Sequence, residues 1–316
     1  MAASNLFTAL PGGAKFPLLG LGTWQSEKGK VRAAVETAIE CGYRHIDAAY
    51  IYSNEKEVGE GIKTKMTDGT IKREDLFVTT KLWLSSHKPD KVEPCCRESM
   101  KNLGLDYIDL YLIHWPMSLV DDKGVFPLGE DGMLIGEDSI DFVDVWKSME
   151  SLVDKGLVRA IGVCNFNLYQ IQRVLDLPPR HPIANLQVEC HPLLAQNELI
   201  DLCKKHGITV TAYSPLGSPE RPGIRTPTDP VLMDDKVVLD IAKKRGVSTA
   251  QVLIRYQIQR GVVVIPKSVT SSRIQQNFEA LNFEMSKEEM QALIDLNRNC
   301  RLLDFPMSKS LKYYPF

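Results

Sequence analysis

The sequence predicts a (β/α)8 barrel, the α/β fold in which eight parallel strands alternate with eight helices. Short runs of β-branched and aliphatic residues alternate along the chain with segments whose apolar residues recur at helical spacing. Most of the short runs are predominantly apolar, as expected of parallel strands that are covered on both faces. Eight such units within 316 residues are the number that closes a barrel of this type.

The predicted elements follow one another in a regular order, and glycines mark the ends of the helices. A glycine readily adopts the left-handed conformation that ends a helix. The strands are predicted at Leu18–Thr23, Tyr43–Asp47, Leu76–Lys81, Ile108–His114, Val158–Val163, Ile183–Glu189, Ile208–Tyr213 and Val262–Pro266. The helices between them are predicted at Lys30–Cys41, Glu55–Lys65, Lys88–Leu103, Val143–Lys155, Leu168–Leu175, Gln196–Lys205, Thr249–Gln259 and Ser272–Ala280. The terminating glycines are Gly42, Gly104, Gly156, Gly207, Gly246 and Gly261.

Several segments add to the simple repeat, and we expect all of them to belong to a single domain over residues 1–316. Met1–Phe16 holds two short apolar patches around Leu10–Gly13, which predicts an N-terminal hairpin at one end of the barrel. Met117–Asp141 and Gly217–Pro230 are long insertions rich in Pro and Gly after strand ends, so we expect lids or binding loops at the C-terminal mouth. Two extra helices are predicted at Asp235–Arg245 and Lys287–Leu296.

The composition is that of a globular protein whose partners are small molecules. Hydrophobic residues make up 44% of the chain and charged residues 25%, while the net charge of −2 gives no reason to expect nucleic acid or an anionic membrane. We find no signal-peptide pattern and no apolar run long enough to span a membrane. Seven cysteines without a CxxC pair predict free thiols. We therefore expect a cytoplasmic protein, most simply a monomer.

Titratable side chains stand at three successive predicted strand ends. Asp47 ends the second strand, Lys81 the third and His114 the fourth, while Tyr52 lies in the loop after Asp47. The carboxyl ends of barrel strands share one mouth, where catalytic residues gather. Each isolated buried charge would cost several kcal/mol, roughly, so we expect these groups to pair with one another or to serve a reaction.

The acidities of these groups suggest acid catalysis at a carbonyl. An ammonium such as that of Lys81 would lower the pKa of a nearby phenol, Asp47 would hold Lys81 in place, and a neutral His114 could donate a hydrogen bond to a carbonyl oxygen. The plainer interpretation is a structural Asp–Lys ion pair with a core histidine. Convergence of four such groups favours function. No metal is expected, because His114 has no second ligand at a suitable spacing.

Three long motifs resemble the aldo-keto reductase family, and closely its aldose reductase and aldehyde reductase branch. They read GYRHIDAAYIYSNEKEVG (Gly42–Gly59), VRAIGVCNF (Val158–Phe166) and IPKSVTSSRIQQNFEAL (Ile265–Leu281). The resemblance runs from about Gly13 to the terminal YYPF. Shorter matches are GLGTW (Gly20–Trp24), TTKLW (Thr79–Trp83), IDLYLIHWP around His114, NLQVECHP (Asn185–Pro192) and TAYSPLGSPERP (Thr211–Pro222).

The resemblance implies roles for the four strand-end residues. Tyr52 is implied as the general acid, with Lys81 and Asp47 lowering its pKa and His114 orienting the substrate carbonyl. Relatives that reduce a conjugated carbon–carbon double bond carry glutamate at the position of His114. The histidine therefore favours reduction of carbonyl groups.

The resemblance also implies a nicotinamide dinucleotide bound without a Rossmann fold. Gly20–Gly22 and Gly59–Gly61 lack the third glycine of that fingerprint. The cations of Lys267 and Arg273 and the two hydroxyls of the run Lys267–Thr270 suit a ribose 2′-phosphate, so NADPH (NADP+) is expected. Cys164 and Gln276 depart from the serine and glutamate usual in relatives. The implied cofactor contacts are Gly22, Thr23, Trp24, Asp47, Cys164, Asn165, Gln187, Tyr213, Ser214, Leu216, Ser218, Lys267, Ser268, Val269, Thr270, Arg273, Gln276 and Asn277.

Tryptophans after three strands predict an apolar substrate pocket. Single tryptophans usually belong to a core, but three at one mouth indicate a recognition surface. Cys300 stands where aldose reductases usually have tryptophan, in a tail loop that sets substrate preference in the family, so the individual aldehyde or ketone stays open. The expected substrate contacts are Trp24, Tyr52, Trp83, His114, Trp115 and Cys300.

Two other functions compete with an NADPH-dependent aldehyde and ketone reductase. A non-catalytic NADPH-binding protein on the same scaffold would bind the dinucleotide without turning over any carbonyl. A barrel lyase with Lys81 as a Schiff-base nucleophile would form a borohydride-trappable adduct and would need no NADPH.

Overall fold

The eight predicted strands are confirmed and form one parallel sheet in chain order. The computed structural model describes residues 6–178, 180–221 and 226–316. The strands are β3 (Leu21–Gly22), β4 (His45–Asp47), β5 (Phe77–Leu82), β6 (Ile108–Ile113), β7 (Val158–Cys164), β8 (Asn185–Glu189), β9 (Thr209–Tyr213) and β10 (Val263–Val264).

The first and last strands of this sheet meet and close the barrel. Isolated parallel bridges join Leu19 to Val264 and Gly22 to Lys267. The amide of Gly20 donates to the Val264 carbonyl over 2.9 Å, and the amide of Gly22 donates to the Pro266 carbonyl over 3.1 Å. Both strands are shorter than predicted, because this seam pairs through separate bridges rather than a continuous ladder.

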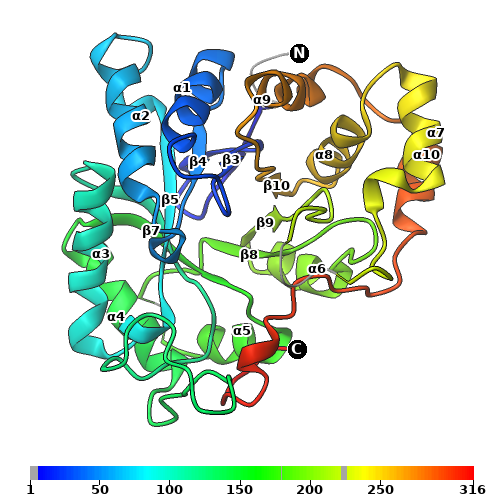
Figure 1. Ribbon diagram of the computed structural model, residues 1–316. Helices are drawn as coiled ribbons and strands as arrows, with labels where there is room; N and C mark the ends of the chain where they lie inside the picture. Colours follow the sequence, from blue (N-terminus) through cyan, green and yellow to red (C-terminus); the bar gives the residue numbers. More distant parts are fainter. Residues whose placement is uncertain (1–5, 179, 222–225) are drawn as a thin grey trace.

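Helices surround the sheet, as the alternating pattern predicts (Figure 1). The eight repeat helices are α1 (Val31–Cys41), α2 (Glu55–Thr67), α3 (Pro89–Leu103), α4 (Phe142–Asp154), α5 (Leu168–Leu175), α6 (Asn197–Lys205), α8 (Thr249–Gln259) and α9 (Ser271–Phe278). Of the two extra helices, α7 (Lys236–Arg245) packs against α8, and α10 (Lys287–Ile294) packs against α7.

Packing inside the barrel is tight enough to require a glycine on β7. A Cβ atom added to Gly162 would lie 2.3 Å from the Asn185 carbonyl oxygen and 2.8 Å from a methyl of Leu112. The neighbouring leucines and isoleucines are almost fully buried, and each contributes about 1.5–3 kcal/mol through that burial. A side chain at position 162 would push β8 away from β7, so close strand contact explains the glycine.

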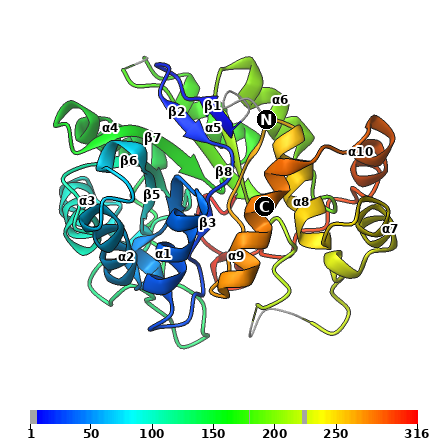
Figure 2. The same cartoon turned by 90° about the horizontal axis from the view of Figure 1, so that it is seen from above.

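The predicted N-terminal hairpin covers the end of the barrel opposite the strand carboxyl ends. β1 (Phe7–Ala9) pairs antiparallel with β2 (Lys15–Pro17), and Figure 2 shows the two strands side by side. The ring of Phe16 is fully buried, with its centroid 4.5 Å from that of Phe77 and 5.0 Å from that of His45. Phe77 begins β5 and His45 begins β4, so Phe16 closes the barrel at the amino ends of its strands. Residues 1–5 of the predicted segment lie outside the described residues.

The long insertion over residues 117–141 lies at the opposite end. Two antiparallel bridges, Leu119 to Gly136 and Leu128 to Leu134, fold it back on itself. The indole nitrogen of Trp83 donates to the Val125 carbonyl over 2.7 Å, which ties the insertion to the residue after β5.

In the described part of the chain, no helix has both the length and the apolar character needed to cross a membrane.

Candidate active site

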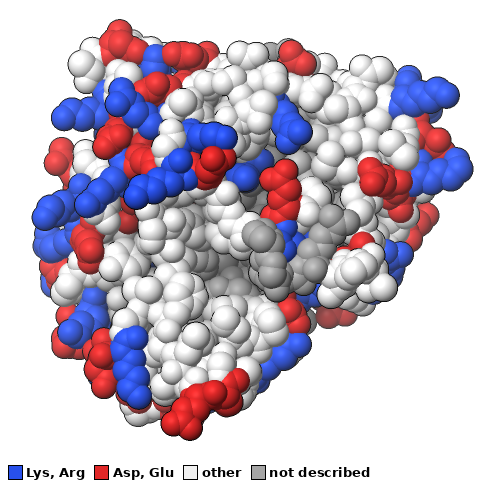
Figure 3. Space-filling view, in the orientation of Figure 1, with Lys and Arg blue, Asp and Glu red and all other residues white. Residues whose placement is uncertain are grey.

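A pocket of about 1040 Å³ opens at the carboxyl ends of the barrel strands. Its lining comes from loops after β3, β4, β5, β6, β7, β9 and β10, and from the starts of α8 and α9. The face of the molecule in Figure 3 is hollowed near its centre, and mainly uncharged residues border the hollow. Every residue predicted from the sequence to bind the dinucleotide lines this pocket.

A buried ion pair lies beneath the pocket floor. The ammonium of Lys81 donates to Oδ1 of Asp47 over 2.5 Å and to the Ala48 carbonyl over 2.8 Å. The side-chain amide of Gln187 donates to the other oxygen, Oδ2, over 2.8 Å. Since the side chains of Lys81 and Asp47 are 0% and 2% exposed, each charge depends on the other and on these dipoles. The predicted pairing of two strand ends is confirmed, and it extends to β8.

We expect the Asp47→Asn variant to lose about 3 kcal/mol or more of its free energy of unfolding, because the Lys81 ammonium would stay buried without a counter-charge. Urea unfolding followed by circular dichroism measures the change. Adding Lys81→Met to this variant should restore part of the loss, since the orphaned charge is then removed. Additive losses in the double variant would contradict a coupled pair.

Tyr52 lies directly above this pair at the end of a short 3-10 turn, Tyr50–Tyr52. The loop is held by the Asn54 side chain, which donates to the Thr23 carbonyl over 2.9 Å. The Lys81 ammonium lies 5.3 Å from the centre of the Tyr52 ring. The phenol is half-buried and lines the pocket, so the structure brings it to the predicted place.

The acidity of Tyr52 differs from the sequence-based expectation. The pKa of the phenol is raised well above its usual value, chiefly because burial disfavours the phenolate and secondly because the Asp47 carboxylate repels it. The expected lowering by Lys81 is therefore wrong. The Lys81 ammonium is bonded to Asp47, whose carboxylate raises the pKa of the phenol. Tyr52 is accordingly protonated at neutral pH.

His114 stands between Tyr52 and Trp83 immediately after β6. Its ring centroid is 5.8 Å from that of Tyr52 and 5.4 Å from that of Trp83, with near-perpendicular planes in both pairs. Burial, aided by the positive charge of Lys81, lowers its pKa well below the usual value. The imidazole is thus neutral, as predicted, and can present an N–H to a carbonyl oxygen. Its Nδ1 is buried without a hydrogen-bond partner among the described residues.

A second polar group spans the inner wall of the pocket between β7 and β9. The hydroxyl of Tyr213 donates to Oδ1 of Asn165 over 2.7 Å. The Nδ2 atom of Asn165 donates to the His114 carbonyl over 3.0 Å and to the Cys164 sulfur over 3.2 Å. Asn165 adopts a left-handed conformation with φ of 62°, which turns its side chain into this network. The Oε1 atom of Gln187 accepts no hydrogen bond within the described residues, so it stays available to a ligand amide.

The other end of the pocket is shaped for an anion. The residue before α9, Thr270, makes no side-chain capping bond, and the first turn of α9 holds no acidic residue. A helix N-terminus with free N–H groups favours negative charge. Lys267 and Arg273 line the same end, and Arg273 has no ion-pair partner in the parts of the chain described. The Lys267 ammonium lies 3.9 Å from the Glu220 carboxylate, a contact that crosses the pocket from the loop after β9.

Aromatic rings form the outer wall of the pocket. Trp24, Trp83 and Trp115 line it as predicted. The Trp83 ring lies 5.3 Å from that of Phe126, and the Trp115 ring 5.3 Å from that of Phe305. This arrangement suits an apolar or aromatic ligand.

Cys300, which the sequence predicts to contact substrate, does not line the pocket, so that contact stays a prediction. Its amide donates to the Leu193 carbonyl over 2.9 Å, and it packs with the apolar cluster between α7 and α8. The tail contributes Leu303 and Phe305 to the pocket instead.

Sequence reasoning missed several lining residues whose segments it identified as functional. Phe126 belongs to the insertion at residues 117–141, and Leu303 and Phe305 belong to the tail loop. Neither segment has a hydrophobic period that would select one residue over its neighbours. Other lining residues not predicted are Gln25, Ile51, Pro215, Pro219, Glu220, Met233, Ser248, Thr249, Ala250, Ile265 and Pro266.

The chain is similar to proteins of known type in both sequence and structure. The family model described as "Aldo/keto reductase family" matches residues 18–298. The chain is 51% identical over 304 residues to aldo-keto reductase family 1 member A1 of Homo sapiens and 50% identical over 304 residues to that of Xenopus tropicalis, each alignment covering 96% of this chain and 92% of the relative. It also matches the solved structure of the aldose reductase from Schistosoma japonicum, with a TM-score of 0.91, 42% identity and 98% of both chains covered.

Proposed function

Because the chain belongs to the aldo/keto reductase family, it is an oxidoreductase that acts on carbonyl groups with a nicotinamide cofactor, and we propose that it reduces aldehydes and ketones to alcohols with NADPH. One observation carries the proposal. A protonated phenol and a neutral imidazole face the same pocket whose far end presents two cations and an uncapped helix N-terminus. The phenol and the imidazole suit a substrate carbonyl, while the two cations and the helix N-terminus suit a phosphate.

The pocket residues fit an extended dinucleotide. When bound, NADPH supplies the hydride that is added to the carbonyl carbon. Lys267 and Arg273 would hold a 2′-phosphate at the start of α9, where both charge and free N–H groups favour an anion. The free carbonyl oxygen of Gln187 and the amide of Asn165 would hold a carboxamide beside the Tyr213 ring. Held in this way, the reacting end would lie beside Tyr52 and His114.

The two catalytic side chains would divide the work at the carbonyl oxygen. His114, kept neutral by its surroundings, donates an N–H that orients and polarises the oxygen. Tyr52 then transfers its proton to the alkoxide that forms as the carbonyl is reduced. The raised pKa of Tyr52 suits this direction, because the phenol stays loaded with its proton and an alkoxide is a much stronger base than a phenolate. The buried ion pair of Asp47 and Lys81 would hold the pocket floor next to the phenol in place.

A turnover panel with the purified full chain tests the proposal. We expect NADPH-dependent reduction of aliphatic and aromatic aldehydes, with kcat/KM for benzaldehyde at least about tenfold higher than for an aldose, because the wall around Trp83, Trp115 and Phe305 is apolar. Consumption of NADPH and formation of alcohol should match one to one. NADPH binding without turnover of any carbonyl would instead favour the non-catalytic alternative. A borohydride-trapped adduct on Lys81 would favour the lyase.

A further inference from the structure

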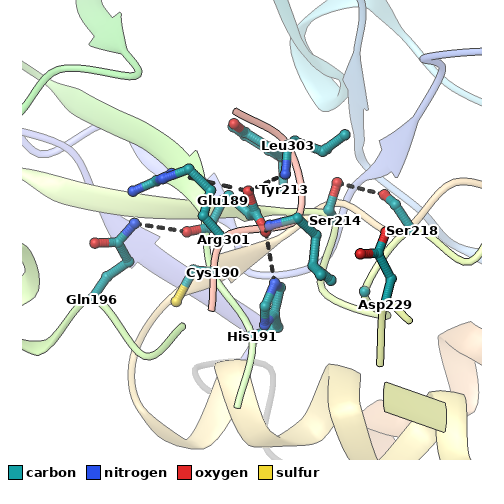
Figure 4. A network of polar contacts seen from close by, with 12 residues as sticks. Glu189, Cys190, His191, Gln196, Tyr213, Ser214, Ser218, Asp229, Arg301 and Leu303 are labelled. Carbon is teal, nitrogen blue, oxygen red and sulfur yellow. Dashed lines mark hydrogen bonds and ion pairs between the residues drawn. The ribbon is translucent and has the colours of Figure 1, made fainter. Parts of the chain in front are cut away.

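The carboxylate of Glu189 is completely buried at the carboxyl end of β8 and receives hydrogen bonds from the C-terminal tail. Its Oε1 accepts from the Leu302 amide over 2.7 Å, and its Oε2 accepts from the Leu303 amide over 3.0 Å. The His191 ring nitrogen Nε2 lies 2.8 Å from Oε1. Figure 4 shows these groups converging, with the Arg301 guanidinium beside them, 3.9 Å from Oε2. One carboxylate thus accepts hydrogen bonds from two backbone amides that lie more than a hundred positions away in the sequence.

The alternation of side chains along β8 explains why this carboxylate reaches the tail. Residues two apart on a strand point to the same face. Gln187 donates to Asp47 under the pocket, and Glu189 repeats its direction one step nearer the mouth. The mechanism proposed above uses Gln187 but gives Glu189 no task. Glu189 does not line the pocket, so it touches neither substrate nor dinucleotide there.

The tail segment that Glu189 holds carries part of the substrate wall. Leu303 and Phe305 line the pocket, and the Phe305 ring lies against Trp115. Phe305 has a φ of 48°, a left-handed conformation that is unfavourable for a side chain of this size and that persists only where surrounding contacts impose it. The Met307 carbonyl accepts from the Leu134 amide over 2.9 Å, so the same segment also supports the insertion over residues 117–141.

We propose that Glu189 is a positioning residue for substrate specificity: its buried carboxylate fastens the tail to β8 and thereby sets where Leu303 and Phe305 meet a bulky substrate. The inference rests on the proposed carbonyl reductase function and deepens it. Small aldehydes, which do not reach the tail wall, depend little on this anchor. Bulky aromatic carbonyls depend on it strongly.

Amide exchange tests the anchor without any turnover. In Glu189→Gln, one carboxylate oxygen becomes an NH2 group, so the two tail amides no longer each have an acceptor. We expect the Leu302 and Leu303 amides to exchange with deuterium at least about tenfold faster, the loss expected for a hydrogen bond to a charged group. The matched control is Asp109→Asn, another buried carboxylate that accepts from a backbone amide and an arginine but lies on β6. It should leave tail exchange unchanged.

Kinetics then test specificity. For Glu189→Gln we expect KM for benzophenone to rise about tenfold with kcat little changed, while KM for propanal and the NADPH dissociation constant stay within twofold, roughly. Asp109→Asn should not alter the ratio of the two KM values. Phe305→Ala should raise the benzophenone KM, and combining it with Glu189→Gln should add little more, because both changes act through one wall.

Each outcome decides a different point. Unchanged exchange of the Leu302 and Leu303 amides in Glu189→Gln overturns the anchor. A KM rise equal for propanal and benzophenone overturns its role in specificity. If Glu189→Gln does not fold, Phe305→Ala alone must still raise the benzophenone KM selectively, and its failure to do so overturns the role of the tail. If the unsubstituted chain reduces neither carbonyl, the proposed function fails, while the exchange measurement still decides whether Glu189 holds the tail.

Discussion

Replacing Tyr52 with phenylalanine should lower kcat for aldehyde reduction roughly a thousandfold, within the range seen when a general acid is lost. The substitution removes only the hydroxyl, and the ring contacts with His114 and the Lys81 ammonium remain possible. The alkoxide would then have to take its proton from water, which the aromatic wall restricts. Steady-state assays with benzaldehyde and saturating NADPH measure the loss.

The same variant should bind NADPH normally, because the phenol is assigned to substrate and not to the dinucleotide. Fluorescence titration gives the dissociation constant. Tyr50→Phe is a suitable control, since Tyr50 lies in the same short turn but outside the pocket lining. It should keep nearly all activity. Equal weakening of NADPH binding in Tyr52→Phe, or equal loss of activity in Tyr50→Phe, would refute the assignment.

Lys267→Met should shift the cofactor preference from NADPH toward NADH by about tenfold or more, because a charge-assisted hydrogen bond to the 2′-phosphate would be lost while NADH has no such phosphate. The start of α9 would keep Arg273 and its free N–H groups, so NADPH binding should weaken without disappearing. Dissociation constants for both dinucleotides, measured at one salt concentration, give the ratio.

An exposed lysine on α7 provides the matched control for this change. Lys236 pairs with Asp240 on the helix surface and lies outside the pocket lining. Lys236→Met should leave the ratio of the two dissociation constants unchanged. An unchanged ratio in Lys267→Met as well would remove the argument for a 2′-phosphate site at this helix.

Most of the fold could be predicted because its signals are local and repeated. Continuous apolar runs indicated all eight strands, and helical periodicity indicated ten helices whose ends differ from the observed ones by at most two residues. The closing strands were predicted too long. Leu18–Thr23 and Val262–Pro266 are mainly apolar, but the geometry of the seam permits only separate bridges, and no pattern in a single sequence encodes that geometry.

The site was predictable where chemistry coincides with a strand end. Asp47, Lys81 and His114 follow apolar runs, so their convergence could be inferred before any coordinates. The position of Cys300 could not, because the tail has no regular element to fix its direction. The raised pKa of Tyr52 depends on its burial and on its proximity to Asp47, and both are set by the three-dimensional structure.

The seam between the first and last strands would give a bound dinucleotide a part in stabilising the barrel. Gly22 and Lys267 face each other across it, and both line the pocket. A bound NADPH would therefore contact the first and the last strand of the barrel together, and its binding free energy would oppose their separation. Where NADPH is scarce this support would be missing, and the seam would open more readily.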